Sequence, residues 1–154
     1  MKDKQTIIVL DFGGQYKDLI ARRVRELGVY SIILSGDTTT KEILSYNPIG
    51  IITTGGPKSV YKPDSPLCDK GLLESGIPVL GICYGMQMMA YVQGGTVESA
   101  SVSEYGQTSG TVISESPLFE KVGNDLKVLM SHTDRITKIP EGFTVTAYTN
   151  DCPI

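Results

Sequence analysis

PVLGICYGMQ, residues 78–87, is an apolar run that passes through two glycines into a helix-forming segment. Gly81, Cys83 and Gly85 give it the Gly-x-nucleophile-x-Gly form of a nucleophile elbow, where a strand turns sharply into a helix. A helix N-terminus favours the thiolate form of a cysteine, because its N–H groups are unpaired and its dipole is positive there. The stretch predicts a strand, a tight turn and a helix, with Cys83 as an attacking thiol. The alternative is that Cys83 is a buried core thiol.

Segments rich in β-branched residues alternate with helical ones through the first half of the chain. Strands are expected at Thr6–Asp11, Val29–Leu34, Gly50–Thr54 and Pro78–Cys83, and helices at Tyr16–Leu27, Thr40–Tyr46, Ser65–Gly76 and Tyr84–Gln93. In the third helix, Ser65 is the expected cap. The alternation predicts an α/β fold with a mostly parallel central sheet and helices on both faces.

The pattern changes beyond Thr96. The segments at 97–114 and 126–132 are typical of shorter strands with no long helix between them, so we expect antiparallel strands added to the sheet in the second half. Since no composition shift marks a linker, residues 1–154 are expected to form one domain.

Composition excludes several classes of function. The 154 residues have a net charge of −3, which offers no broad basic surface for nucleic acid. The N-terminus lacks a secretory signal and no apolar run reaches membrane-spanning length, so we expect a cytoplasmic protein without membrane contact. Cys68, Cys83 and Cys152 form no C-x-x-C pair, and no metal site is expected from their spacing. No Gly-x-Gly-x-x-Gly or Gly-Lys motif is present to bind a nucleotide.

Acyl transfer through a thioester also needs hydrogen-bond donors for the oxyanion. An elbow supplies the backbone N–H of the residue after the nucleophile, here Tyr84. A second donor is expected from the turn that follows the strand ending at Thr54, where Gly55 and Gly56 let the backbone approach a ligand. The alternative for this segment is an ordinary turn.

Seven short motifs together define a resemblance that covers essentially the whole chain. They are LDFGGQY (10–16), IARRVRELGVY (20–30), TGGPKS (54–59), GICYGMQ (81–87), GGTV (94–97), EYG (104–106) and MSHTD (130–134). With them the chain resembles the class I glutamine amidotransferase domains of the GMP synthase family. This resemblance implies a flavodoxin-like fold.

The resemblance also implies a reaction. Cys83 would attack the side-chain amide of glutamine, and Gly56 and Tyr84 would supply the oxyanion N–H groups. Further contacts to glutamine would come from the family's matching positions, which are Gln87, Ser131, His132 and Asp134, with Ser131 and His132 in a substrate loop. Ammonia would pass to a synthetase domain or subunit that aminates XMP with ATP and Mg²⁺. The domain itself would need no cofactor, and the parent enzyme allows a homodimer.

One part of the family's catalytic machinery is missing from these residues. The family uses a histidine oriented by a glutamate in a Y-G-x-Q-F-H-P-E motif, and the chain has no such motif and one histidine, His132. We therefore expect a glutaminase domain incomplete at its C-terminus, without the synthetase domain, that is inactive alone. The alternatives are another class I amidotransferase subunit, serving anthranilate, carbamoyl phosphate or CTP synthesis, and a non-catalytic module of the same fold.

Overall fold

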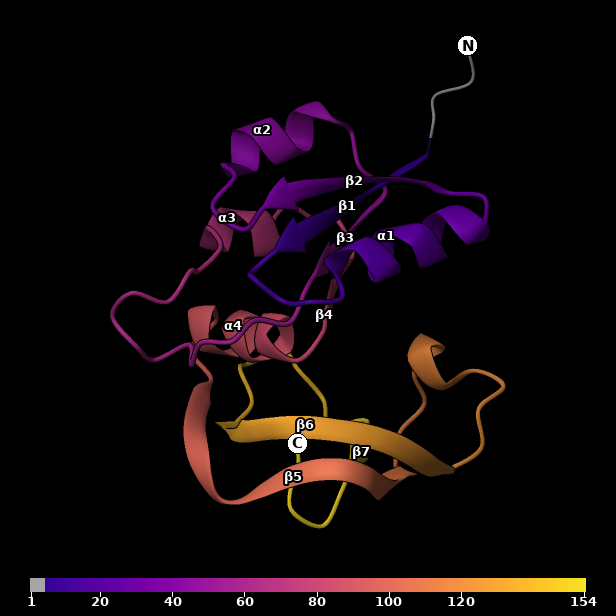
Figure 1. Cartoon of the computed structure of the whole chain (residues 1–154), viewed down its shortest axis with the longest axis vertical. Coiled ribbons are helices and arrows are strands. Elements are labelled where there is room, and N and C mark those ends of the chain that lie inside the picture. The colour runs from indigo at the N-terminus through magenta and orange to yellow at the C-terminus, as the bar shows by residue number, and fades with distance from the viewer. Residues whose placement is uncertain (1–4) are drawn as a thin grey trace. The chain divides into compact units, whose positions relative to one another are not determined.

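The structure, a computed structural model, describes residues 5–154. It consists of two compact units, the first ending at Val92 and the second running from Gln93 to Ile154 (Figure 1). The first unit is an α/β unit and the second is built from antiparallel strands.

Four parallel strands form the sheet of the first unit. They are β1 (Thr6–Asp11), β2 (Tyr30–Ser35), β3 (Gly50–Thr53) and β4 (Val79–Gly81), in the order β2-β1-β3-β4. The helices are α1 (Lys17–Glu26), α2 (Thr40–Ser45), α3 (Lys70–Leu73) and α4 (Tyr84–Val92). All three strand pairings are parallel, which confirms the predicted α/β fold with a parallel sheet.

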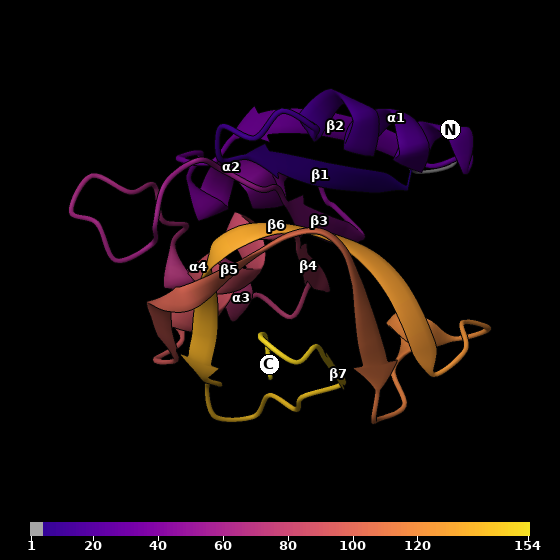
Figure 2. The same ribbon diagram turned by 60° about the horizontal axis from the view of Figure 1, so that its bottom comes forward.

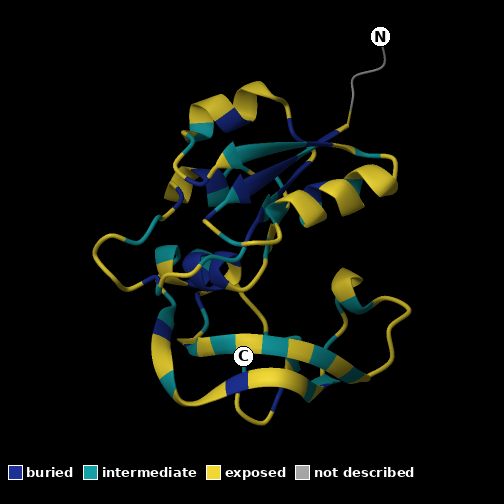
Figure 3. Cartoon of the chain, in the orientation of Figure 1, coloured by how far each residue is buried: buried dark blue, intermediate teal, exposed yellow. Residues whose placement is uncertain are grey.

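Strand β1 lies at the centre of this sheet, and its side chains form the core of the unit. Ile8, Val9 and Leu10 are fully buried, and Figure 3 shows most of β1 in the dark blue of buried residues. The strand is apolar without alternation because right-handed crossovers place α1 on one face and α2 and α3 on the other. Figure 2 shows α1 and α2 on opposite sides of β1.

The helix predicted for Ser65–Gly76 is shorter than expected, and its predicted cap was wrong. Helix α3 begins only at Lys70, and the Asp69 side chain caps it by accepting the Gly71 N–H at 2.9 Å. Ser65 instead donates its hydroxyl to the Ser59 carbonyl within the preceding loop. That bond stabilises the loop conformation, as serine commonly does by bonding to nearby backbone.

The second unit contains the expected antiparallel strands, but their expected length and place were wrong. Strands β5 (Thr96–Val112), β6 (Asp125–Lys138) and β7 (Ala147–Tyr148) form a sheet of their own in the order β6-β5-β7, and β5 alone has 17 residues. These strands pair with one another and not with the parallel sheet, because β5 and β6 form one long hairpin and β7 pairs with β5. A register shift between Ser99 and Glu104 interrupts the hairpin, and Figure 2 shows the strong curvature that such irregularities produce.

No helix in residues 5–154 combines the length and the apolar character needed to cross a membrane.

Candidate active site

Cys83 occupies a strained turn between β4 and α4. Its φ is +53°, in the left-handed region that residues with a side chain rarely adopt. Strain of this kind persists only where the surrounding structure enforces it. The thiol is exposed to solvent. The predicted strand, tight turn and helix are therefore present at this position, and the alternative of a buried core thiol is wrong.

The glycines on either side of Cys83 are required by close packing. A Cβ on Gly81 would lie 2.7 Å from the backbone nitrogen of Met86, and a Cβ on Gly85 would overlap the Thr53 carbonyl oxygen and hydroxyl. Two backbone bonds join the turn to the end of β3, from Ile82 N–H to the Thr53 carbonyl (2.9 Å) and from Gly85 N–H to the Thr54 carbonyl (3.0 Å). Neither glycine leaves room for a methyl group.

The loops that follow β1 and β3 meet beside this turn. A Cβ on Gly55 would lie 3.6 Å from Cβ of Cys83, and a Cβ on Gly56 would lie 2.5 Å from the Phe12 carbonyl. The Thr54 hydroxyl accepts the Phe12 N–H at 3.0 Å, so the two loops are hydrogen-bonded together. Open α/β sheets bind ligands at the carboxyl ends of their strands, which is where these loops lie.

Tyr84 fixes the start of α4. Its ring is buried against Phe12, with centroids 5.7 Å apart, and its hydroxyl donates to the Pro66 carbonyl at 2.6 Å. Desolvation raises the pKa of this phenol. The backbone N–H of Tyr84 is at the first position of the helix, ahead of the first intrahelical bond, so it is available to an oxyanion formed at Cys83.

Gln87 lies one turn further along α4. Its side chain is buried and its N–H donates to the Cys83 carbonyl at 3.1 Å. Among the predicted site residues, the first unit thus brings together Gly56, Cys83, Tyr84 and Gln87.

The remaining predicted residues lie in the second unit, on a strand rather than in the expected loop. Ser131, His132 and Asp134 belong to β6, where Ser131 pairs with Tyr105 and His132 with Glu104 of β5. The loop expectation was wrong because this segment is hydrogen-bonded along the β5–β6 hairpin.

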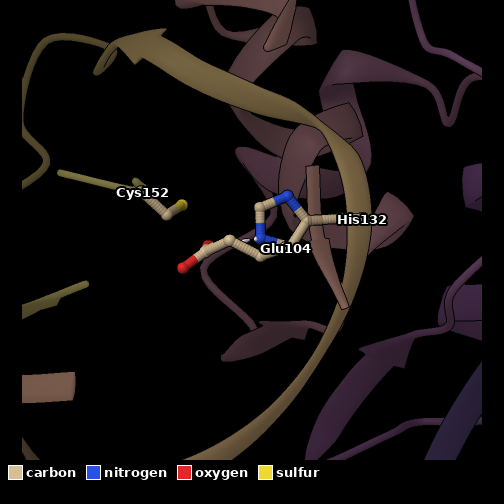
Figure 4. Close-up of side chains that lie close together, drawn as sticks. All are labelled: Glu104, His132 and Cys152. Carbon is tan, nitrogen blue, oxygen red and sulfur yellow. Dashed lines mark hydrogen bonds and ion pairs between the residues drawn. The ribbon is translucent and has the colours of Figure 1, made fainter. Parts of the chain in front are cut away.

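His132 is held by a glutamate that sequence reasoning did not connect with it. Its Nε2 lies 2.9 Å from Oε2 of Glu104 (Figure 4). Its Nδ1 lies 3.0 Å from the Asp134 carbonyl. The hydroxyl of Thr149 donates to the other carboxylate oxygen of Glu104 at 2.7 Å. Glu104 belongs to the EYG motif, and only the antiparallel register brings that motif opposite MSHTD.

The other two thiols are in different surroundings from Cys83. Cys68 is buried beside Met88, and desolvation raises its pKa to about 11. Burial also raises the pKa of Cys152, with the charge of Glu104 adding to the effect. Neither thiol is placed to act as a nucleophile.

Comparison with known families decides what kind of protein has this arrangement. The family described as glutamine amidotransferase class-I matches residues 8–154. The chain belongs to the class-I glutamine amidotransferase family. A solved structure agrees with this assignment. The amidotransferase chain superposes on the crystal structure of a proposed GMP synthase subunit from Thermoplasma acidophilum with a TM-score of 0.84 and 28% sequence identity. The match covers 98% of this chain and 76% of that one.

Curated relatives are similar at higher identity over part of their length. The amidotransferase chain is 52% identical over 151 residues to a GMP synthase (glutamine-hydrolyzing) of Clostridium botulinum, which covers 98% of this chain and 29% of the relative. A protein of the same description from Syntrophomonas wolfei is 49% identical over 152 residues, covering 99% of this chain and 30% of the relative. The chain thus spans about three tenths of these relatives.

Proposed function

We propose that this chain is the glutaminase part of a GMP synthase and that Cys83 is its nucleophile. The observation that supports this most directly is the exposed Cys83 thiol at φ +53°, in a turn whose flanking glycines admit no side chain. The names of the curated relatives support the choice of GMP synthase over the other class I amidotransferases.

The proposed chemistry begins with attack on the glutamine amide. The Cys83 thiolate forms a bond to the side-chain carbonyl carbon, and the carbonyl oxygen becomes an oxyanion that the N–H groups of Gly56 and Tyr84 stabilise. The C–N bond then breaks, nitrogen leaves as ammonia with a proton from a general acid, and a thioester remains. Water cleaves the thioester to glutamate and restores the thiol. Both proton transfers need an acid–base group.

Glutamine is held by further residues in this proposal. Gln87, Ser131, His132 and Asp134 are the contacts that the family resemblance implies. Since the His132 side chain is bound to Glu104, we assign its contact to the backbone. A homodimer and a cytoplasmic location stay predictions.

The ammonia is proposed to reach a synthetase part that aminates XMP with ATP and Mg²⁺. The residues that the structure describes do not offer a site that fits Mg²⁺. Their one group of three or more metal-ligating side chains is Glu104, His132 and Cys152, whereas Mg²⁺ binds oxygen ligands and retains several waters. No step in this chain is therefore assigned to Mg²⁺ or ATP.

Substrate protection tests the proposal on this chain. Iodoacetamide should alkylate Cys83 first, and millimolar glutamine should slow that alkylation while asparagine and glutamate should not. The Gln87→Ala variant should lose the protection but keep the alkylation. If glutamine and asparagine protect Cys83 equally, or not at all, the chain does not bind glutamine at this thiol and the proposal fails.

A further inference from the structure

Three side chains with metal-binding atoms meet in the second unit, which the proposed glutaminase reaction does not use as a group. Glu104 comes from β5, His132 from β6 and Cys152 from the turn after β7. A carboxylate oxygen, an imidazole nitrogen and the thiol sulfur all lie within 4.8 Å of one another (Figure 4). Glu104 and Cys152 are buried, so this is an interior cluster and not a surface patch.

We propose that Glu104, His132 and Cys152 bind a zinc ion, with a fourth position open to water. A thiolate, an imidazole and a carboxylate together match the ligands of zinc, and the soft thiolate disfavours Mg²⁺ and Ca²⁺. Sites with three protein ligands and one open position are common for zinc.

The distances need small adjustments only. Tetrahedral zinc with ordinary bond lengths separates its nitrogen and oxygen ligands by about 3.4 Å, and its nitrogen and sulfur ligands by about 3.6 Å. The present separation of Nε2 of His132 from Oε2 of Glu104 is 2.9 Å, so these atoms move apart by a few tenths of an ångström. The sulfur lies within 4.8 Å of the other two ligand atoms, so it moves inward by at most about an ångström, within reach of a rotation about the Cys152 side chain.

A second set of contacts orients the ligands as metal sites require. The Nδ1 of His132 bonds to the Asp134 carbonyl at 3.0 Å, which directs Nε2 toward the cluster. The Thr149 hydroxyl donates to Oε1 of Glu104 at 2.7 Å and accepts the Cys152 N–H at 3.0 Å. Thr149 therefore holds two of the three ligands without using Oε2 or the sulfur. The Cys152 thiol donates to the Ile154 carbonyl at 3.3 Å, a bond that is lost when the thiol gives up its proton to bind the ion.

Zinc binding releases two protons from the cluster. The thiol proton of Cys152 and the proton between Nε2 of His132 and Glu104 pass to solvent, and the ion takes their place. The His132 side chain keeps 14% of its exposure, which gives the ion a route in. Bound zinc ties β5 and β6 to the turn at residues 149–152, so we expect it to stabilise the second unit.

Cobalt substitution tests the site on the full chain. Co²⁺ added to the apoprotein should give the visible absorption of a tetrahedral ion and a near-ultraviolet sulfur-to-cobalt band, at one equivalent. Cys152→Ser should abolish the sulfur-to-cobalt band, whereas Cys83→Ser, which removes the exposed thiol, should retain it. Thr149→Val should weaken zinc binding about 10- to 100-fold. If the band persists in Cys152→Ser, or disappears in Cys83→Ser, the assignment is wrong.

Thiol protection gives a second measurement that does not depend on a folded variant. In the wild-type chain, zinc should slow the alkylation of Cys152 at least about tenfold while leaving that of Cys68 unchanged, although both are buried. Equal protection of both thiols, or none, overturns the zinc site. Either result leaves the proposed glutaminase function untouched, since that rests on Cys83.

Discussion

Nε2 of His132 lies 2.9 Å from Oε2 of Glu104, while Nδ1 of the same ring lies 3.0 Å from the Asp134 carbonyl. Both ring nitrogens therefore have partners within the second unit. A general base needs a ring nitrogen within reach of the reacting proton. The side chain of the one histidine of the chain is thus already engaged at both ring nitrogens.

We predict that the 154-residue chain does not turn over glutamine. Because both ring nitrogens of His132 already have partners, its side chain assists neither the departure of ammonia nor the cleavage of the thioester. Each such proton transfer contributes about 10²- to 10⁴-fold to rate. Ammonia release from glutamine should equal that of the Cys83→Ala variant, and His132→Gln should leave it unchanged. Steady release that Cys83→Ala abolishes would show that the chain contains a working base.

Gly85→Ala should destabilise the chain, because its methyl group would overlap Thr53. We expect a loss of about 1–3 kcal/mol in the free energy of unfolding, the usual range for overpacking, measured by urea denaturation. Gly123→Ala is the matched control, since a Cβ there meets nothing within 4 Å, and it should change stability by less than about 0.5 kcal/mol. Equal effects at the two glycines would argue against a tightly packed turn.

Asp11 should contribute stability that depends on pH. Desolvation raises the pKa of its carboxyl, but hydrogen bonds from Lys17 and from the Gly13 N–H outweigh it and leave the pKa below its ordinary value. A lowered folded-state pKa means that the stabilisation is complete above about pH 4, the ordinary aspartate value, and is lost as the pH falls through the folded-state pKa.

Asp11→Asn should accordingly cost about 1 kcal/mol or less at pH 7 and progressively less below about pH 4. Urea denaturation at a series of pH values measures this difference, with Asp37→Asn at an exposed position as the control. A cost for Asp11→Asn that stays constant from pH 7 to pH 3 would contradict the role assigned to the carboxylate.

The first unit was largely predictable because its signals are local. The continuous apolar run at Thr6–Asp11 is a parallel strand, and Gly81 and Gly85 mark the turn at Cys83, which the structure forms. The start of helix α3 was predicted too early because Ser65 and Asp69 are both residues that commonly cap helices. Asp69 is the cap because its carboxylate also accepts the Thr40 hydroxyl, 29 residues away in sequence, at 2.9 Å.

The second unit was less predictable because its contacts are distant in sequence. Glu104 and His132 meet only through the β5–β6 register, and Cys152 reaches them through the turn held by Thr149. No spacing rule within a short window detects such a set. The same holds for MSHTD, for which the family resemblance implied a substrate loop. Its first residues lie in the strand that the pattern predicted at 126–132, and that strand continues to Lys138 because the segment pairs with β5.

Selective labelling of the three thiols tests the central claim that Cys83 is an activated nucleophile. The chain is treated with a chloromethyl ketone analogue of glutamine, and mass spectrometry measures the rate at each cysteine. Cys83 should react at least about tenfold faster than Cys68, whose pKa burial raises to about 11, and faster than Cys152 by a similar factor. Equal rates at all three thiols, or no reaction at Cys83, would contradict the account.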